Sequence, residues 1–280
     1  PEKMPMQRFR LWLQWLNSVS AHKALLKLGP DHIICTHFTA AEMLSRARRK
    51  GYNIPPTSVV VTDFDVHWMW IHRSLDEFFV ADHEAAARLA TRGVAEEHIH
   101  VTGIPVCPGF ARTYDAEEQK KALGLQPGTL TLMLMAGGFG VSSIDRTARR
   151  LLGHFGHLQL IAVAGRNEAL RASLDRVAAE FPGRLAAIGF TTEVEKYMAA
   201  SDLIISKPGG LTTSECMALG KPMIMIDPIP GQEQHNATYI MERGAAMMAY
   251  DEIGIIYRLE WIFRGSDHLA AHHQQAMFLA

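Results

Sequence analysis

Short runs of apolar residues alternate with amphipathic stretches along nearly the whole chain. The runs predict strands at residues 33–37, 58–62, 78–81, 99–102, 131–135, 158–164, 185–188, 203–205 and 222–226. Between them, the spacing of apolar positions predicts helices at 40–50, 83–92, 167–180, 194–200 and 233–243. Strands and helices in alternation indicate parallel sheets with helices on both faces. The strand runs lack strict alternation, as in strands buried on both sides. We therefore expect an α/β, doubly wound fold.

The alternation breaks between residues 105 and 127, which contain prolines, glycines and a charged helix-like stretch at 115–123. Because a single core seldom grows past about 250 residues, a chain of 280 residues favours two domains. We expect two Rossmann-like lobes, 1–127 and 128–280. A predicted helix at 6–28 precedes the first strand, whereas a doubly wound domain opens with a strand. We therefore expect the first lobe to be incomplete and the chain to be truncated at both ends.

A glycine-rich turn follows the strand predicted at 131–135 and precedes a helical stretch at 142–152. It consists of Gly137, Gly138, Phe139 and Gly140. Glycines at such a turn let backbone N–H groups approach a phosphate at a helix N-terminus. A tight turn without any ligand fits the same residues equally well.

A second loop, 207–215, follows the strand predicted at 203–205. Its proline and two glycines fix a sharp turn before a helix. Thr212 and Glu215 have the spacing of a capping box, in which the carboxylate returns to the N-cap amide. Alternatively, Glu215 accepts hydrogen bonds from ribose hydroxyls, as acidic residues do in dinucleotide folds. A carboxylate has several lone-pair sites, so both roles can hold together.

A third loop, 228–236, follows the strand predicted at 222–226. Two prolines and a glycine precede five consecutive polar side chains that open the next helix. The stretch fits a hydrophilic first turn in which Glu233 complements the helix dipole. It also fits a ligand site, because α/β proteins bind ligands at the carboxyl ends of parallel strands, and sugar hydroxyls need such donors and acceptors.

Composition excludes several classes of function. The net charge of −1 gives no field that attracts nucleic acid, so we expect no nucleic-acid partner. Three cysteines without a CxxC pair favour a reducing compartment. The scattered histidines form no metal motif and we recognise no Asp-x-Asp motif, so we expect no metal and no cofactor. No apolar run reaches the length of about 18 residues needed to span a bilayer, and no signal peptide is recognisable. We expect a cytoplasmic protein.

Residues 1–28 combine five lysine and arginine side chains with Glu2 as the one acid. The same stretch contains tryptophan, phenylalanine, leucine and methionine. Basic and aromatic residues together suit a helix that lies on an anionic lipid surface. A helix packed on the first lobe with a basic outer face fits as well. We favour the membrane, which places the protein at its inner face.

Several motifs, in order along the chain, resemble glycosyltransferase family 28. They are KPGGLTTSE at 207–215, ALGKP at 218–222, and PGQE at 230–233 followed by Asn236. Further matches are TH at 36–37, VTDF at 61–64 with His67, TGIPV at 102–106, the turn at 137–140, and GF at 189–190. Within the family, the resemblance is to the diacylglycerol sugar transferases, which include monogalactosyldiacylglycerol synthases and processive diacylglycerol glucosyltransferases.

The resemblance implies a GT-B architecture, with two lobes facing across a cleft, and a hexose transfer from a UDP-sugar to diacylglycerol or a related lipid. The donor-binding residues that it implies are Gly137, Gly138, Phe139, Gly140, Phe190, Thr191, Gly209, Gly210, Thr212, Glu215, Gln232, Glu233 and Asn236. Among them, the glycine turn would face the diphosphate, Phe190 and Thr191 the uracil, and Glu215 the ribose. Gln232 and Glu233 would bind the sugar hydroxyls. UDP-hexose would be a substrate, and the transfer would invert the anomeric carbon.

The resemblance also implies that Asp63 and His67 lie on the acceptor side. Family members carry an N-terminal glycine-rich loop with a histidine near the reacting centre, and we find no such motif here. The catalytic base is therefore left unassigned. Two other functions stay open: an enzyme like UDP-N-acetylglucosamine 2-epimerase, and a non-catalytic remnant that binds a UDP-sugar or a membrane.

Overall fold

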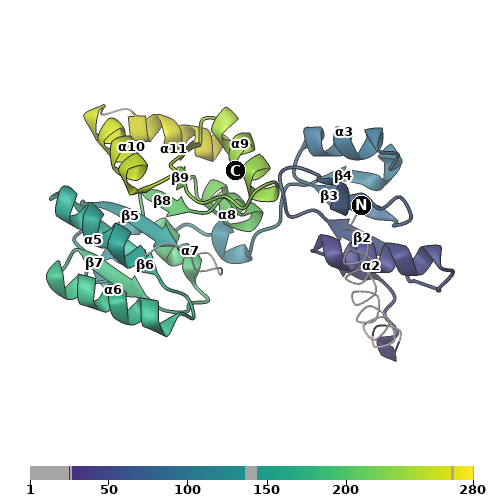
Figure 1. The fold of residues 1–280 in the computed structure, drawn as a ribbon, viewed down its shortest axis with the longest axis horizontal. Helices are drawn as coiled ribbons and strands as arrows, with labels where there is room; N and C mark the ends of the chain where they lie inside the picture. The colour runs from purple at the N-terminus through teal and green to yellow at the C-terminus, as the bar shows by residue number, and fades with distance from the viewer. Residues whose placement is uncertain (1–24, 26, 136–143, 266–267, 280) are drawn as a thin grey trace, which may run out of the picture. The chain divides into compact units, whose positions relative to one another are not determined.

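The chain forms two compact units, Pro1–Ile104 and Pro105–Ala280, in a computed structural model that describes residues 25, 27–135, 144–265 and 268–279. Each unit contains one sheet whose neighbouring strands are all parallel. The α/β class and the parallel sheets predicted from the sequence are confirmed. Figure 1 shows the first unit in purple to blue and the second from blue through teal and green to yellow.

The first unit has a four-stranded sheet in the order β1-β2-β3-β4. The strands are β1 (Ile33–Cys35), β2 (Thr57–Val60), β3 (Glu77–Val80) and β4 (Ile99–Val101). The helices are α2 (Phe38–Arg49) and α3 (His83–Thr91), with short 3-10 helices η1 (Trp68–Trp70) and η2 (Glu96–His98). Leu44 from α2, Phe78 from β3 and Leu89 from α3 meet in one buried cluster. This apolar core holds both helices on the sheet.

The second unit has a six-stranded sheet in the order β10-β9-β8-β5-β6-β7. Its strands are β5 (Leu130–Met135), β6 (Leu158–Val163), β7 (Leu185–Ile188), β8 (Leu203–Ser206), β9 (Met223–Met225) and β10 (Ala246–Met248). The first strand of this unit, β5, lies inside the sheet. Strands β6 and β7 are added on one side of it, and β8, β9 and β10 on the other. The winding therefore reverses between β5 and β8, which pair from Leu132↔Leu203 to Leu134↔Ile205. Ligands of doubly wound sheets bind at such a switch point.

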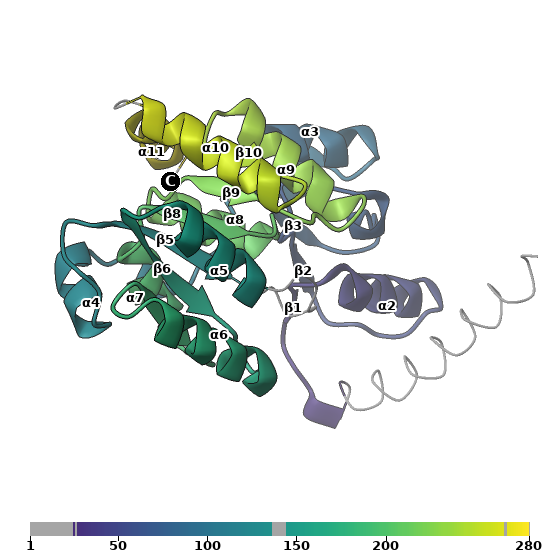
Figure 2. The same ribbon diagram turned by 60° about the vertical axis from the view of Figure 1, so that its left-hand side comes forward.

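Helices surround this sheet. They are η3 (Pro108–Ala111), α4 (Ala116–Ala122), α5 (Ile144–His154), α6 (Glu168–Glu180), α7 (Val194–Ala199), α8 (Gly210–Ala218), α9 (Gln232–Glu242), α10 (Glu252–Arg264) and α11 (His268–Phe278). Helices α5, α6 and α10 share one buried cluster with the sheet, to which they contribute Leu151, Leu174 and Leu259. Figure 2 shows α5 and α6 on the near side of the strands, and α8 packs against α9 and α11.

The segment 105–127 is built into the second unit. Phe110 and Leu125 are buried. The backbone amide of Gln126 donates to Gln159 Oε1 at 2.9 Å, and Gln159 Nε2 donates back to the Gln126 carbonyl at 2.8 Å. The two units divide before this segment, at 104–105, whereas the sequence pattern places the boundary at 127. The sequence pattern indicates where the alternation of strands and helices breaks. It does not indicate the hydrogen bonds that attach this segment to β6.

All nine strands predicted from the sequence are present, each within two residues of its predicted ends. Strand β10 and helix α10 are not among the predicted elements. Residues 243–249 consist of arginine, glycine, alanine and methionine, which have little preference for strands. Pairing with β9 makes this segment a strand, so its structure depends on a neighbour rather than on local preference.

Candidate functional site

Two of the predicted motifs follow neighbouring strands at the carboxyl edge of the second sheet. The loop 207–209 follows β8, and the loop 226–231 follows β9, which pairs with β8 at Ser206↔Met225. The first of these loops lies at the switch point between β5 and β8. Gly137, Gly138, Phe139 and Gly140 lie outside the described residues, so their contact with a diphosphate stays a prediction.

Helix α8 begins three residues earlier than a capping box of Thr212 and Glu215 requires. Gly209 is the N-cap, and the backbone of Thr213 donates to its carbonyl at 2.9 Å. The predicted capping box of Thr212 and Glu215 is therefore wrong, because Thr212 is the third residue of the helix. The glycine pair lets the helix start at Gly210. No described side chain caps this end, so the amides of the first turn are left without a side-chain acceptor, as at helix N-termini that bind anions.

Glu215 lies in the middle of α8 and is half-buried. Among the residues that the structure describes, none donates a hydrogen bond to its carboxylate. Burial raises the pKa of Glu215 to about 7, and the nearby carboxylate of Glu195 adds to the rise. Glu195 packs on η3, where a Cβ added to Gly109 would lie 2.9 Å from its carboxyl carbon. A half-buried carboxyl group without a protein donor is suited to accept hydrogen bonds from ligand hydroxyls.

The loop before α9 has a conformation that only glycine adopts easily. Gly231 has φ +91° and ψ −90°. Its amide donates to Gln234 Oε1 at 3.0 Å, and the amide of Ile229 donates to Glu233 Oε2 at 2.7 Å. Glu233 lies in the first turn of α9, as the helix-dipole interpretation requires, but its carboxylate also fixes the loop. Asn236 is buried one turn further on.

The structure brings the loops 207–215 and 228–236 together. A Cβ added to Gly209 would lie 3.7 Å from Glu233 Oε1, so this carboxylate lies beside the N-cap of α8. Gln232, the first residue of α9, is partly exposed next to it. The edge therefore combines free helix amides, a carboxyl group in α8 and a carboxylate with a carboxamide in α9. These are the groups that bind phosphate and sugar hydroxyls.

Phe190 and Thr191 follow β7 at the same edge. The Phe190 ring is 59% exposed, and the guanidinium carbon of Arg166 lies 4.5 Å from its centroid. Thr191 Oγ1 accepts a hydrogen bond from the Glu193 amide at 3.0 Å. An exposed aromatic ring beside a ligand edge provides a flat surface on which a base can stack. Arg166 is not among the site residues predicted from the sequence, although its position just after β6 and Gly165 places it at this edge.

In the first unit, the structure brings Asp63 and His67 together beyond the carboxyl end of β2. Asp63 is buried, and its Oδ2 accepts a hydrogen bond from Trp70 Nε1 at 3.0 Å. His67 Nε2 lies 3.8 Å from the same oxygen, and His67 Nδ1 accepts from the Met69 amide at 3.3 Å. The pair is thus fixed by η1. Its place on the acceptor side stays a prediction.

Residues 63–65 have an Asp-x-Asp spacing, so the expectation that the chain contains no such motif is wrong. Asp63 is bonded to Trp70, and Asp65 Oδ1 lies 3.2 Å from Arg88 Nε, so each carboxylate has a protein partner of its own. Within the described ranges, no three histidine, cysteine or acidic side chains gather as metal ligands would. A reaction without an essential metal stays a prediction.

Most of the stretch 1–28 lies outside the described residues, so its contact with a membrane stays a prediction. None of the helices in the described part of the chain is long and apolar enough to cross a bilayer.

Two family models match the chain, one in each half. Residues 2–106 match "Monogalactosyldiacylglycerol (MGDG) synthase", and residues 133–263 match "Glycosyltransferase family 28 C-terminal domain". A processive diacylglycerol beta-glucosyltransferase of Bacillus subtilis (strain 168) is 34% identical over 219 residues, which are 78% of this chain and 57% of the relative. The enzyme of the same name from Bacillus cereus (strain 03BB102) is 32% identical over 238 residues, 85% of this chain and 61% of the relative. The chain thus spans about three fifths of these relatives.

Solved structures with similar folds share little sequence with the chain. The S. aureus MnaA–UDP co-structure superposes with a TM-score of 0.67 at 14% identity and covers 94% of this chain and 75% of that one. Acinetobacter baumannii MurG superposes with a TM-score of 0.61 at 16% identity, covering 92% and 72%. At these identities the similarity establishes the fold alone, which confirms the predicted GT-B class of two Rossmann-like units.

Proposed function

Because the chain belongs to glycosyltransferase family 28, we propose that it transfers a hexose from a UDP-sugar to the hydroxyl of diacylglycerol or a related lipid. The two family matches support this proposal, and so do the names of the Bacillus relatives. The chain spans 57% of the first of these relatives, so the activity is proposed for the protein to which this sequence belongs. The acceptor is a membrane lipid, which favours a peripheral position at the inner face of the membrane.

The half-buried Glu215 carboxyl, without a donor among the described residues, is the observation that carries the donor site. Ribose hydroxyls would supply the missing hydrogen bonds. The diphosphate would lie against the outward-facing amides of α8, which begins at Gly210, with Lys207 close in the chain. Gln232 and Glu233 would bind the hexose hydroxyls, because Glu233 lies beside Gly209. Asn236 would hold this loop in place.

The uracil would stack beside the Phe190 ring, with Thr191 at its edge. Arg166 lies over the same ring and orients it. Gly209 and Thr212 border the space between the base and the hexose in this arrangement. The base site then follows β7, the ribose and diphosphate sites follow β8, and the sugar site follows β9, all at one sheet edge, which supports a single extended donor nucleotide.

In the proposed reaction, a base removes the proton of the lipid hydroxyl, whose oxygen attacks the anomeric carbon. The bond between that carbon and the diphosphate oxygen breaks, and UDP leaves with the electron pair. Amides at the start of α8 stabilise the charge that grows on the diphosphate, so the step needs no metal ion or cofactor. Asp63 and His67 would lie on the acceptor side, and the base itself is not assigned.

Titration calorimetry with UDP tests the donor site. Glu215→Ala should weaken UDP binding about tenfold, because hydrogen bonds to a charged group contribute about 1.5–3 kcal/mol. Glu242→Ala, which removes an exposed acid at the end of α9, should bind UDP as the unmodified chain does. Equal affinity of Glu215→Ala and the unmodified chain would remove the ribose assignment.

Radiolabelled UDP-hexose with diacylglycerol vesicles tests the transfer. We expect label in the lipid fraction, unchanged by a chelator. Release of a free epimerised sugar without any lipid acceptor would instead support an epimerase. UDP binding with no product of either kind would identify a protein that binds the nucleotide sugar without turning it over.

A further inference from the structure

Helix α10 is apolar on two opposite sides. Its inner side contributes three buried residues to the core of the second unit: Ile255, Leu259 and Ile262. On the outer side, Ile253, Tyr257 and Trp261 follow one another every fourth residue and are 64%, 64% and 41% exposed. Tyr250, just before the helix, is 82% exposed. A helix on the surface of a soluble domain normally has polar residues on its outer side. We call these four residues the outer stripe.

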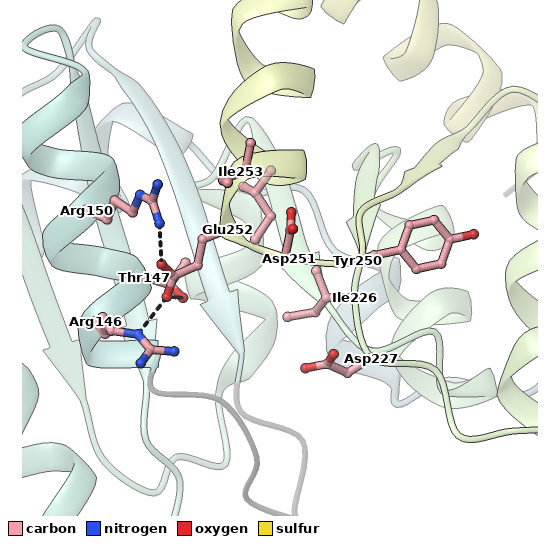
Figure 3. Close-up of a pocket in the computed structure, with 10 residues that line it drawn as sticks. Arg146, Thr147, Arg150, Ile226, Asp227, Tyr250, Asp251, Glu252 and Ile253 are labelled. Atoms are coloured by element: carbon pink, nitrogen blue, oxygen red, sulfur yellow. Dashed lines mark hydrogen bonds and ion pairs between the residues drawn. The ribbon is translucent and has the colours of Figure 1, made fainter.

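A pocket of about 330 Å³ opens at the N-terminal end of the outer stripe. It lies among α5, the start of α10 and the residues that follow β9 and β10 (Figure 3). Tyr250 and Ile253 belong both to the stripe and to the pocket wall. The pocket and the stripe therefore form one continuous surface, polar at one end and apolar along α10.

Three arginines of this surface are more exposed than the acids with which they pair. Arg146 Nε and Arg150 each donate to Glu252 at 2.9 Å, as the dashed lines in Figure 3 show. Arg146 is 70% exposed, but the Glu252 side chain that it contacts is only 19% exposed. At the other end of α10, Arg264 is 75% exposed and its partner Glu260 34%. Glu252 and Glu260 are thus less exposed than the arginines that they pair with, whose guanidinium groups carry further N–H donors.

Two acids lie on the opposite wall of the pocket. Asp251 caps α10 by accepting from the Gly254 amide at 2.6 Å, and Asp227 is exposed beside Ile226. The side of this surface that attracts anions is therefore the α5 side and the last turn of α10. Neutral polar head groups fit the space between the two walls.

We propose that this face of the second unit docks on a lipid bilayer, with the outer stripe in the head-group region and Arg146, Arg150 and Arg264 at lipid phosphates. Tyrosine and tryptophan prefer this interface because their rings are apolar and their N–H or O–H groups are polar. Arginine stems lie along apolar surface while the guanidinium groups reach phosphate oxygens, which they bind in pairs. The docking does not depend on the transfer reaction or on residues 1–28.

Co-sedimentation of the full chain with vesicles tests the proposal. The vesicles contain phosphatidylcholine alone or phosphatidylcholine with phosphatidylglycerol. The double variant Ile253→Ser/Tyr257→Ser should partition about tenfold less into both kinds of vesicle, because two exposed apolar side chains no longer enter the head-group region. Arg264→Gln should reduce partitioning by about fivefold on the anionic vesicles and leave the neutral ones unchanged.

Met241→Ser is the control, because it removes an exposed apolar side chain from α9 of the same unit and should partition as the unmodified chain does. UDP titration of every variant shows that the second unit is folded and keeps this result separate from the donor site. Equal partitioning of Ile253→Ser/Tyr257→Ser and the unmodified chain would overturn the proposal. A dimer in light scattering that this variant converts to monomer would overturn it too, since the stripe would then be an interface between copies.

Discussion

The half-buried environment of Glu215 changes its chemistry from that of an ordinary surface carboxyl group. Burial raises its pKa to about 7, with a further contribution from Glu195, whereas an unfolded chain would have the ordinary value of 4.5. The folded state therefore keeps a proton that the unfolded state loses as pH rises from 4.5 to 7. The contribution of Glu215 to the free energy of unfolding therefore falls as pH rises through this window and is constant above it.

Glu215→Gln should remove this pH dependence, because the carboxamide stays neutral. We expect the variant to be more stable than the unmodified chain by about 1–2 kcal/mol at pH 8, a value discounted because the group is partly exposed. The difference should shrink toward pH 5. Urea unfolding of both proteins from pH 5 to 8 measures it. Saturating UDP should reverse the order at pH 8, because ribose hydroxyls stabilise the charged carboxylate. A difference that does not change with pH would contradict the burial argument.

The identities of the site residues could be predicted from the sequence, but their partners could not. Glu215 and Glu233 stand in motifs whose order indicates a donor site, and the structure brings Glu233 beside Gly209. Arg166 over Phe190 and Glu195 near Glu215 are contacts between elements far apart in the chain. Such contacts depend on how the helices pack around the sheet, and no local pattern encodes them.

Among the elements, the loop between β9 and α9 depends most on one backbone conformation. Gly231→Ala places a Cβ where φ is +91°, which strains the backbone by about 1–3 kcal/mol. The loop should shift and displace Gln232 and Glu233. We expect the affinity for UDP-hexose to fall about tenfold and the affinity for UDP to stay unchanged, both measured by calorimetry. A parallel loss for UDP would show that the loop supports the whole nucleotide instead.

Gly183→Ala is the matched control for this variant. Gly183 also has a positive φ, +72°, and space for a Cβ, but it lies in the turn between α6 and β7 at the other edge of the sheet. Its strain should lower stability without changing either affinity. The two variants together separate loop geometry at the site from a general loss of stability.

The predicted elements show where sequence patterns are informative. Apolar runs predict nine strands correctly, because burial on both faces leaves a strong signal. The capping-box spacing of threonine and glutamate predicts the start of α8 three residues late, because the glycine pair opens the helix instead. Strand β10 gives almost no signal, since its alanine and methionine residues become a strand through pairing with β9.

At the scale of the whole molecule, the chain consists of two units with separate apolar cores, and all the described donor-site residues belong to the second. The position of the division could not be predicted from the sequence alone. Prolines and glycines around residue 105 and around residue 127 give equal reasons to divide the chain. Phe110 is buried, and two hydrogen bonds join Gln126 and Gln159. These contacts attach residues 105–127 to the second unit, so the division lies at 104–105.

A chain of residues 105–280 should therefore fold by itself and bind UDP within a few-fold of the affinity of the full chain, whereas residues 128–280 should not fold stably. Removal of 105–127 exposes apolar surface that Phe110 and Leu125 cover, and it removes both hydrogen bonds between Gln126 and the buried Gln159 carboxamide, which keeps its bond to Thr131. Together these losses amount to about 5 kcal/mol, which is comparable to the whole stability of many domains. Thermal unfolding by circular dichroism and UDP calorimetry on both chains measure the difference. Equal midpoints would show that the segment is a linker after all, and a folded 105–280 chain without UDP binding would show that the donor site needs the first unit.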